Sequence, residues 1–193
     1  MRLVTLALAV LPAVMSASLL APASAETVSD SDPRHDVVRY DADTLDDEGT
    51  PVSGKARVDM VRHRFSYGGK RIRVVLRLND LRRTKRVTWL GVPLQWNTNG
   101  EFGYAEMGVV FRRNGPAKGR GWFESGDADD CTVDHDVDFR ADRVRVAIPA
   151  TCLGSPPAIR AYAIAYTVTN DSIFVDTSPD NPLGGTGVRI KQG

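Results

Sequence analysis

The sequence predicts an all-β protein, a single antiparallel β-sandwich of the jelly-roll or immunoglobulin-like kind with one disulfide bond. Apolar and polar residues alternate with period two in several segments, and no segment places apolar residues at i, i+3, i+4 and i+7 over ten positions. Turn-forming clusters separate these segments, for example at 97–100, 114–116, 155–157 and 179–182. Both cysteines fall at the ends of one predicted hairpin.

Length and composition favour one folded domain. The chain has 193 residues, of which 42% are hydrophobic, enough for a core of its own. Its 25 basic and 24 acidic residues leave a net charge of +1, so we expect no nucleic-acid partner.

The first 25 residues resemble a secretory signal peptide. Arg2 precedes an apolar run from Leu3 to Leu11, and small residues at 23–25 match a cleavage site. The alternative is an uncleaved anchor helix. No second long apolar run follows, so we expect no membrane span. The expected organisation is a signal peptide (1–25), a flexible arm (26–34) and one β-sandwich domain (35–193) of a secreted, extracellular, monomeric protein.

A first hairpin is predicted from 57–67 and 71–78, turning at Gly68-Gly69. This register places Phe65 opposite Ile72 and His63 opposite Val74, on an apolar face. The other face would carry a basic surface made of Arg62, Arg64, Arg71, Arg73 and Arg77.

A second hairpin is predicted from 133–139 and 143–148, with a two-residue loop at 141–142. In that register Cys131 lies opposite Cys152, which is within disulfide range, and export agrees with an oxidised pair. Pro149 predicts a bulge or a strand end before Cys152. Further strands are expected at 37–41, 87–96, 104–112, 120–124, 159–168, 173–176 and 187–191, giving nine to eleven in all.

Charge is segregated along the chain. Residues 26–54 carry a net charge of −7, residues 55–86 carry +10, and residues 124–142 carry −7. The basic hairpin face therefore either contacts an acidic segment or is available to an anionic polymer such as wall phosphate or acidic glycan. The first of these is our expectation.

Catalytic motifs are absent from the sequence. No Gly-x-Ser-x-Gly occurs, and His35, His63 and His135 stand in unrelated contexts without zinc-binding spacing. We therefore expect a protein that is not an enzyme and has no catalytic residues. A hydrolase with an acid pair assembled by folding remains an alternative.

Two acidic clusters suggest calcium as the only cofactor to consider. Carboxylates on loops are ligands that calcium prefers, although solvated loop acids are the simpler interpretation. The weak metal candidates are Asp41, Asp43, Asp46, Asp127 and Asp129.

Aromatic residues in the central strands suggest a sugar-binding surface. Flat rings stack on sugar rings, while tryptophans in a sandwich are more often part of the core. The candidate stacking residues are Trp89, Trp96, Tyr104 and Trp122.

Several short motifs carry a family resemblance. Asp32-Pro33-Arg34-His35-Asp36-Val37, Val61-Arg62-His63, the segment from Val74 to Leu81, Gly100-Glu101-Phe102-Gly103-Tyr104 and the segment from Val146 to Gly154 resemble small secreted proteins of high-GC Gram-positive bacteria. The layout is also similar to β-sandwich modules of the DOMON and family-nine carbohydrate-binding type. The resemblance implies secretion and a β-sandwich, and it implies no activity.

These observations lead to one functional expectation and two alternatives. We expect a non-catalytic binding or envelope-associated module with an unknown extracellular ligand, either a glycan or a cell-wall polymer. The alternatives are a calcium-assisted carbohydrate-binding domain and a secreted hydrolase.

Overall fold

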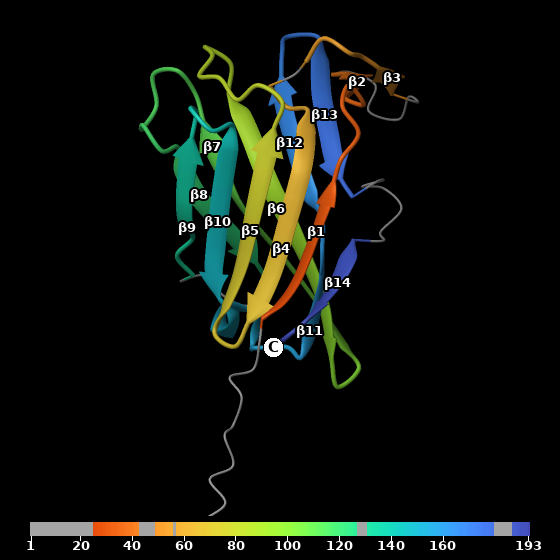
Figure 1. Cartoon of the computed structure of the whole chain (residues 1–193), viewed down its shortest axis with the longest axis vertical. Helices are drawn as coiled ribbons and strands as arrows, with labels where there is room; N and C mark the ends of the chain where they lie inside the picture. The colour runs from red at the N-terminus through yellow and green to blue at the C-terminus, as the bar shows by residue number, and fades with distance from the viewer. Residues whose placement is uncertain (1–24, 43–48, 56, 127–130, 180–186) are drawn as a thin grey trace, which may run out of the picture.

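The computed structural model confirms the all-β sandwich. It describes residues 25–42, 49–55, 57–126, 131–179 and 187–193. Fourteen strands and one short 3-10 helix, η1 (Ala150–Leu153), lie in these ranges, and the strands form two antiparallel sheets packed face to face (Figure 1). The predicted signal peptide lies almost entirely outside the described residues. No helix in the described ranges has the length and apolar character needed to cross a membrane.

Sheet A is the front sheet in Figure 1 and contains both predicted hairpins. Its strands run in the order β1 (Glu26–Ser31), β4 (Met60–Gly68), β5 (Arg71–Leu78), β10 (Arg143–Pro149) and β9 (Asp134–Asp138). Each of the two long central strands alternates buried apolar residues with solvent-facing ones, as the period-two pattern predicts.

Sheet B is built on the long hairpin of β6 (Thr88–Thr98) and β7 (Glu101–Phe111). β8 (Arg120–Ser125) pairs with the other edge of β7. The other edge of β6 pairs with β12 (Ala163–Val168) along its first half and with β11 (Ala158–Ala161) along its second half. Beyond these two strands lie β13 (Ser172–Ser178), β2 (Val38–Asp41) and β3 (Thr50–Pro51) on one branch, and β14 (Val188–Lys191) on the other.

One apolar core fills the space between the sheets. Phe65, Val74 and Leu76 of sheet A are at most 1% exposed, as are Leu90 and Met107 of sheet B. Polar side chains also join the sheets inside this core. Asp176 of β13 accepts the backbone N–H of Met60 at 2.5 Å, and the His63 ring lies 2.6 Å from the Ser178 hydroxyl.

The N-terminal segment corrects the prediction of a flexible arm at 26–34. Glu26–Ser31 forms β1, which pairs with β4 over six residues. The segment is polar because only one of its faces is covered, with Val28 packed against the core. A strand edge offers unpaired backbone groups, and pairing with the edge of β4, together with Val28, holds this polar segment as a strand.

Both hairpins contain the predicted strands in registers shifted by two residues. His63 lies opposite Leu76 instead of Val74, and the first turn is Gly69-Lys70, where Gly69 has a positive φ of 28°. In the second hairpin Val144 lies opposite Val137, so its loop has four residues. Asp138 ends that strand early because its carboxylate accepts the backbone N–H groups of Arg140 and Ala141. A shift of two residues leaves every side chain on its predicted face.

The disulfide between Cys131 and Cys152 is confirmed, with 5.9 Å between the two Cα atoms. The ladder does not carry the pairing, because β10 ends at Pro149 and η1 brings Cys152 to Cys131. Pro149 therefore acts as the strand end that the sequence predicted. The predicted strand 159–168 is divided into β11 and β12, and β3 has no counterpart among the predicted strands.

Candidate functional site

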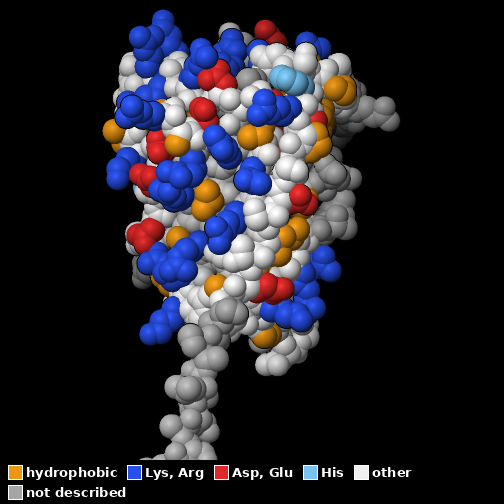
Figure 2. All heavy atoms as spheres, in the orientation of Figure 1, with side chains coloured by type: hydrophobic (Ala, Val, Ile, Leu, Met, Phe, Trp, Pro, Cys, Tyr) orange, Lys and Arg blue, Asp and Glu red, His pale blue; other side chains and the backbone are white. Residues whose placement is uncertain are grey.

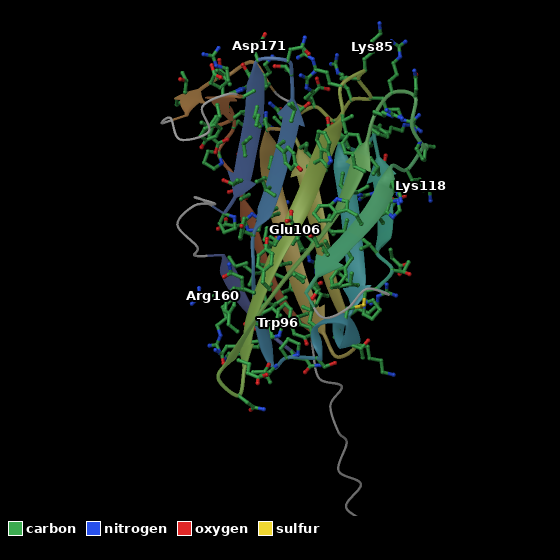
Figure 3. All side chains as sticks on the ribbon, turned by 180° about the vertical axis from the view of Figure 1, so that it is seen from behind. Lys85, Trp96, Glu106, Lys118, Arg160 and Asp171 are labelled. Atoms are coloured by element: carbon green, nitrogen blue, oxygen red, sulfur yellow. A yellow bond between two sulfur atoms is a disulfide. The ribbon has the colours of Figure 1, made fainter. Side chains whose placement is uncertain are left out.

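The solvent-facing side of sheet B, the sheet nearest the viewer in Figure 3, carries aromatic, phenolic and carboxylic side chains. Buried Ala105 and Met107 flank Glu106 in β7, so alternation directs the Glu106 side chain away from the core. We call this surface the Glu106 face. It comprises Trp89 and Gln95 of β6, Phe102, Tyr104 and Glu106 of β7, Trp122 and Glu124 of β8, and Tyr162 and Tyr166 near β12.

A gap at Gly91 holds the carboxylate of Glu106. A Cβ atom at Gly91 would lie 2.4 Å from Oε1 of Glu106, so only glycine leaves room for the carboxylate there. Burial raises the pKa of Glu106, and the nearby Glu124 carboxylate, directly across the ladder, raises it further. The Tyr104 hydroxyl lies 3.5 Å from Oε2 and opposes that rise by donating a weak hydrogen bond. Glu106 is therefore a half-buried acid with an increased tendency to keep its proton.

Three tyrosine hydroxyls lie in the electrostatic field of Glu106. Burial raises the pKa of Tyr104 to about 12, and the Glu106 charge contributes to that rise. The same two causes, burial first, raise the pKa of Tyr162 and of Tyr166. All three hydroxyls therefore remain protonated at neutral pH. Tyr104 donates its hydrogen bond to Glu106, and the hydroxyls of Tyr162 and Tyr166 can donate to an oxygen-rich ligand.

The four predicted stacking residues take different positions. Tyr104 is 46% exposed and Trp89 stacks on Tyr166 at 5.1 Å, both on the Glu106 face. Trp122 lies over Gly108, whose missing Cβ makes room for the indole. Trp96 points to the other side of β6, where it covers Gly103 and packs against the core. Three of the four are thus brought to one surface, and Trp96 is a supporting residue.

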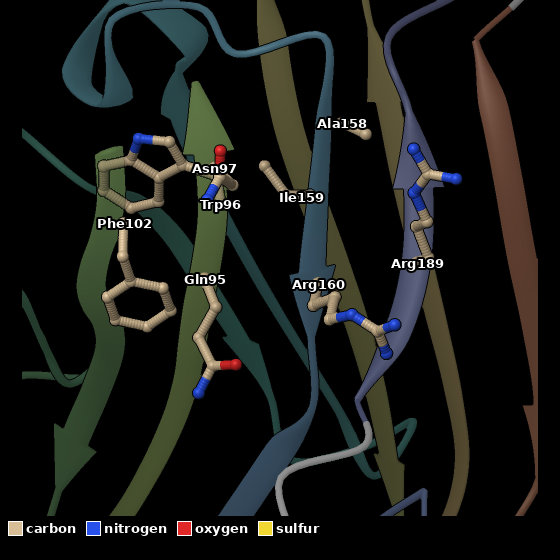
Figure 4. Close-up of a pocket in the computed structure, with 8 residues that line it drawn as sticks. All are labelled: Gln95, Trp96, Asn97, Phe102, Ala158, Ile159, Arg160 and Arg189. Carbon is tan, nitrogen blue, oxygen red and sulfur yellow. The ribbon is translucent and has the colours of Figure 1, made fainter. Parts of the chain in front are cut away.

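A pocket of about 350 Å³ adjoins this surface at the end of the β6–β7 hairpin (Figure 4). Phe102, which is 69% exposed, stands at one side, and Arg160 and Arg189 stand at the other. Gln95 links the pocket to the Glu106 face, because it lies opposite Tyr104 on one side and opposite Arg160 on the other. The remaining lining residues are Trp96, Asn97, Ala158 and Ile159.

Sequence analysis did not identify Glu106, Phe102, Tyr162 or Tyr166 as site residues. A signal was present, because Phe102, Tyr104 and Glu106 alternate with small or apolar residues and therefore share one strand face. The partners of these residues lie more than fifty residues further along the chain, at Tyr162 and Tyr166, and no local pattern connects them.

Only one of the five predicted calcium ligands falls within the described residues. Asp43, Asp46, Asp127 and Asp129 lie outside those residues, and Asp41 is exposed at the end of β2. A different group has metal-binding spacing, since carboxylate oxygens of Asp32, Asp36 and Asp176 all lie within 4.8 Å of one another. We call these three residues the aspartate triad.

Burial dominates the chemistry of the aspartate triad. Asp176 is 4% exposed, and this burial, with added repulsion from Asp36 and Asp32, raises its pKa to about 8. Both of its oxygens also accept backbone N–H groups, from Met60 and Thr177, which oppose the rise. At neutral pH Asp176 therefore carries a proton in the absence of a cation.

The histidines make separate contacts, as the sequence predicts. His35 lies beside the buried Asp59, and the His135 ring lies 3.3 Å from the carbonyl oxygen of Val133. His63 is 1% exposed beside Ser178, and burial lowers its pKa. No histidine belongs to a metal-binding group within the described ranges.

The chain matches no protein-family model, no curated protein and no solved structure in the comparisons. The chemistry of its surfaces is therefore the basis for the functional proposal.

The raised pKa of Asp176 predicts that the protein loses stability as pH rises from 6.5 to 8.5 in a metal chelator. The unfolded chain releases this proton near pH 3.8, whereas the folded protein holds it to about pH 8. Between those values the folded state binds more protons, so each pH unit lowers the free energy of unfolding by about 1.4 kcal/mol. Urea unfolding should show a total loss of about 2 kcal/mol.

The Asp176→Asn variant provides the comparison. It should be less stable overall, because one of two backbone donors loses its acceptor, but its stability should vary little over this pH range. His63 does not interfere, because its lowered pKa makes stability fall only as pH drops below 6.5. A variant that keeps the wild-type slope would contradict the assignment to Asp176.

Proposed function

We propose that this protein is a secreted glycan-binding module whose ligand lies across the Glu106 face. The proposal rests on one observation, the exposed rings of Phe102 and Tyr104 beside a half-buried carboxyl surrounded by tyrosine hydroxyls. Sugars present apolar C–H faces and a dense set of hydroxyls. Flat aromatic rings suit the first, and carboxyl, amide and phenol groups suit the second.

The pocket next to this face supports a chain-like ligand. Tyr104, Gln95 and Arg160 follow one another across β7, β6 and β11, so their side chains form a continuous polar row. That row ends at the pocket between Phe102 and Arg189. A saccharide of several units can contact the Glu106 carboxyl with one unit and the pocket with the next.

We expect wild-type protein to bind at least one insoluble polysaccharide or cell-wall preparation in a sedimentation assay, and Phe102→Ala with Tyr104→Ala to weaken that binding about tenfold. Loss of two stacking surfaces of this size corresponds to roughly 1.4 kcal/mol or more. Val168→Ala is the matched control. It removes an exposed apolar side chain from the same sheet, at Val168, the last residue of β12.

Folded wild-type protein that binds none of the polysaccharides would contradict the proposal. Equal binding by the double variant and the wild type would show that the glycan does not bind at the Glu106 face.

Glycoside hydrolysis is the second candidate function, favoured by the pair of carboxyls on this face. Glu106 and Glu124 are directly opposite each other in β7 and β8, and burial raises the pKa of Glu106. A glycosidase uses two carboxyls in different environments, one as the proton donor to the leaving oxygen. In this version Glu106 donates that proton.

The hydrolase version predicts new reducing ends when the bound polysaccharide is incubated with wild-type protein, and none with Glu106→Gln. The amide keeps the shape and hydrogen-bonding groups of the acid but cannot donate the proton, so binding should persist while turnover stops. Binding by the wild type without any released product would leave the non-catalytic module as the function.

In the calcium-assisted version of this function, the aspartate triad holds the ion. Hard carboxylate oxygens at this spacing suit calcium, which would displace the proton from Asp176. At pH 8 millimolar calcium should then raise Tm by several degrees, and Asp176→Asn should abolish that rise. Magnesium at the same concentration is the control for ionic strength. An unchanged Tm with calcium would rule out this version.

A further inference from the structure

The solvent-facing side of sheet A, on the opposite side of the molecule from the Glu106 face, is densely basic (Figure 2). Alternation places the charged residues of four strands on this one surface. The arginines are Arg62 and Arg64 of β4, Arg71, Arg73 and Arg77 of β5, and Arg143 and Arg145 of β10, and the aspartates are Asp134, Asp136 and Asp138 of β9.

The aspartates of β9 neutralise only the near part of this surface. Asp138 pairs with Arg143 at 3.2 Å, and Asp136 pairs with Arg145 at 3.3 Å. Asp134 pairs with Arg71, the one member of the predicted basic surface that has an acidic partner in the described residues. The aspartates of β9 therefore form ion pairs with two arginines of β10 and with one arginine at the start of β5.

Four arginines form no ion pair with those aspartates. Arg62, Arg64, Arg73 and Arg77 are all exposed, and none forms an ion pair with any residue that the structure describes. We call them the arginine quartet. Same-face neighbours on one strand are about 7 Å apart, and adjacent strands are about 5 Å apart, so the four charges occupy a compact surface.

The position of Arg77 lowers the stability of the ligand-free protein. Arg77 lies directly opposite Arg62 on one side and directly opposite Arg143 on the other. Like charges in direct cross-strand positions destabilise a sheet. Neither Arg62 nor Arg77 forms an ion pair with a described residue, and a bound anion would relieve this repulsion.

A polar hollow beside this row provides space for a ligand. It has a volume of about 580 Å³ and is lined by Arg62, Arg77, Arg34 and Asn79, with the carboxylates of Asp32 and Asp142 also at its wall. Asp142 already accepts the backbone N–H of Leu81, which holds its carboxylate in place. The hollow extends the basic surface beyond the end of β4.

We propose that the arginine quartet binds a linear phosphodiester polymer that lacks bases, such as a polyol-phosphate chain. The arginine guanidinium matches phosphate oxygens with two parallel N–H donors, and four separate arginines favour a chain with repeated anions over a single ion. The residues between them are small or aliphatic, namely Ser66, Val75 and Ala147. The strands of this face present no aromatic ring on which a nucleobase could stack.

This inference extends beyond the proposed function and is independent of it, because the two surfaces lie on different sheets. A protein with both sites would bridge a neutral glycan and a phosphate polymer. Loss of one binding activity should leave the other unchanged, so failure of either proposal can be recognised separately.

Binding of a glycerol-phosphate polymer and of inorganic polyphosphate, measured by fluorescence anisotropy at several salt concentrations, tests the proposal. For four neutralised phosphates the slope of log K against log salt should be about −3, and Arg62→Gln with Arg77→Gln should reduce it by about half and weaken binding about tenfold. Arg71→Gln with Arg145→Gln is the matched control. It removes the same charge from arginines already paired with aspartates, so binding should change less than about twofold.

The stability of the polymer-free variant gives a second readout. Arg62→Gln with Arg77→Gln should keep or raise Tm, because it removes cross-strand repulsion, whereas a purely structural role would lower Tm. The proposal is overturned if this variant binds like the wild type, or if the control loses as much affinity. It is also overturned if polyglutamate binds as well as the phosphate polymers, or if single-stranded DNA binds more tightly than they do.

Discussion

The packing of the two sheets along one continuous apolar interface is the constraint on which every surface feature depends. Ala105 and Met107 have no exposed surface, and they point Glu106 outward between them. In β5, the buried side chains of Val74 and Leu76 likewise direct the neighbouring Arg73 and Arg77 toward solvent. A slip of one residue in either strand would expose the core, so the core holds both surfaces in place.

Space on the sheet surface then decides how deep a polar group lies. Gly91 leaves room for the Glu106 carboxylate, and the resulting burial is the main cause of its raised pKa. A methyl group at Gly91 would displace the carboxylate toward solvent and reduce that burial. Asp176 lies deeper, between the sheets, and its pKa rises to about 8 although two backbone donors favour the charged form. Both acids show burial prevailing over local hydrogen bonds.

The charges are divided between the sheets in a way that gives each surface a different chemistry. Sheet A presents arginines, and β9 supplies aspartates to those nearest to it. Sheet B presents aromatic rings, hydroxyls and carboxyls, and it places Arg160 and Arg189 at the pocket. The near-zero net charge of the chain conceals this division, because the basic stretch 55–86 is offset in the total by the acidic stretches 26–54 and 124–142.

The sequence by itself determined the strands and the faces of both hairpins, together with the cysteine pair. Period-two alternation is a local property, and it placed Arg62, Arg73 and Asp136 on the correct side although both registers were shifted by two residues. Only the tertiary structure decided which distant strands became neighbours. It placed Tyr162 beside Glu106, joined Asp176 to Asp32 and Asp36, and left Arg77 between two other arginines. These contacts depend on the order of strands in the sheets, which short-range patterning does not specify because each edge strand can pair with several partners.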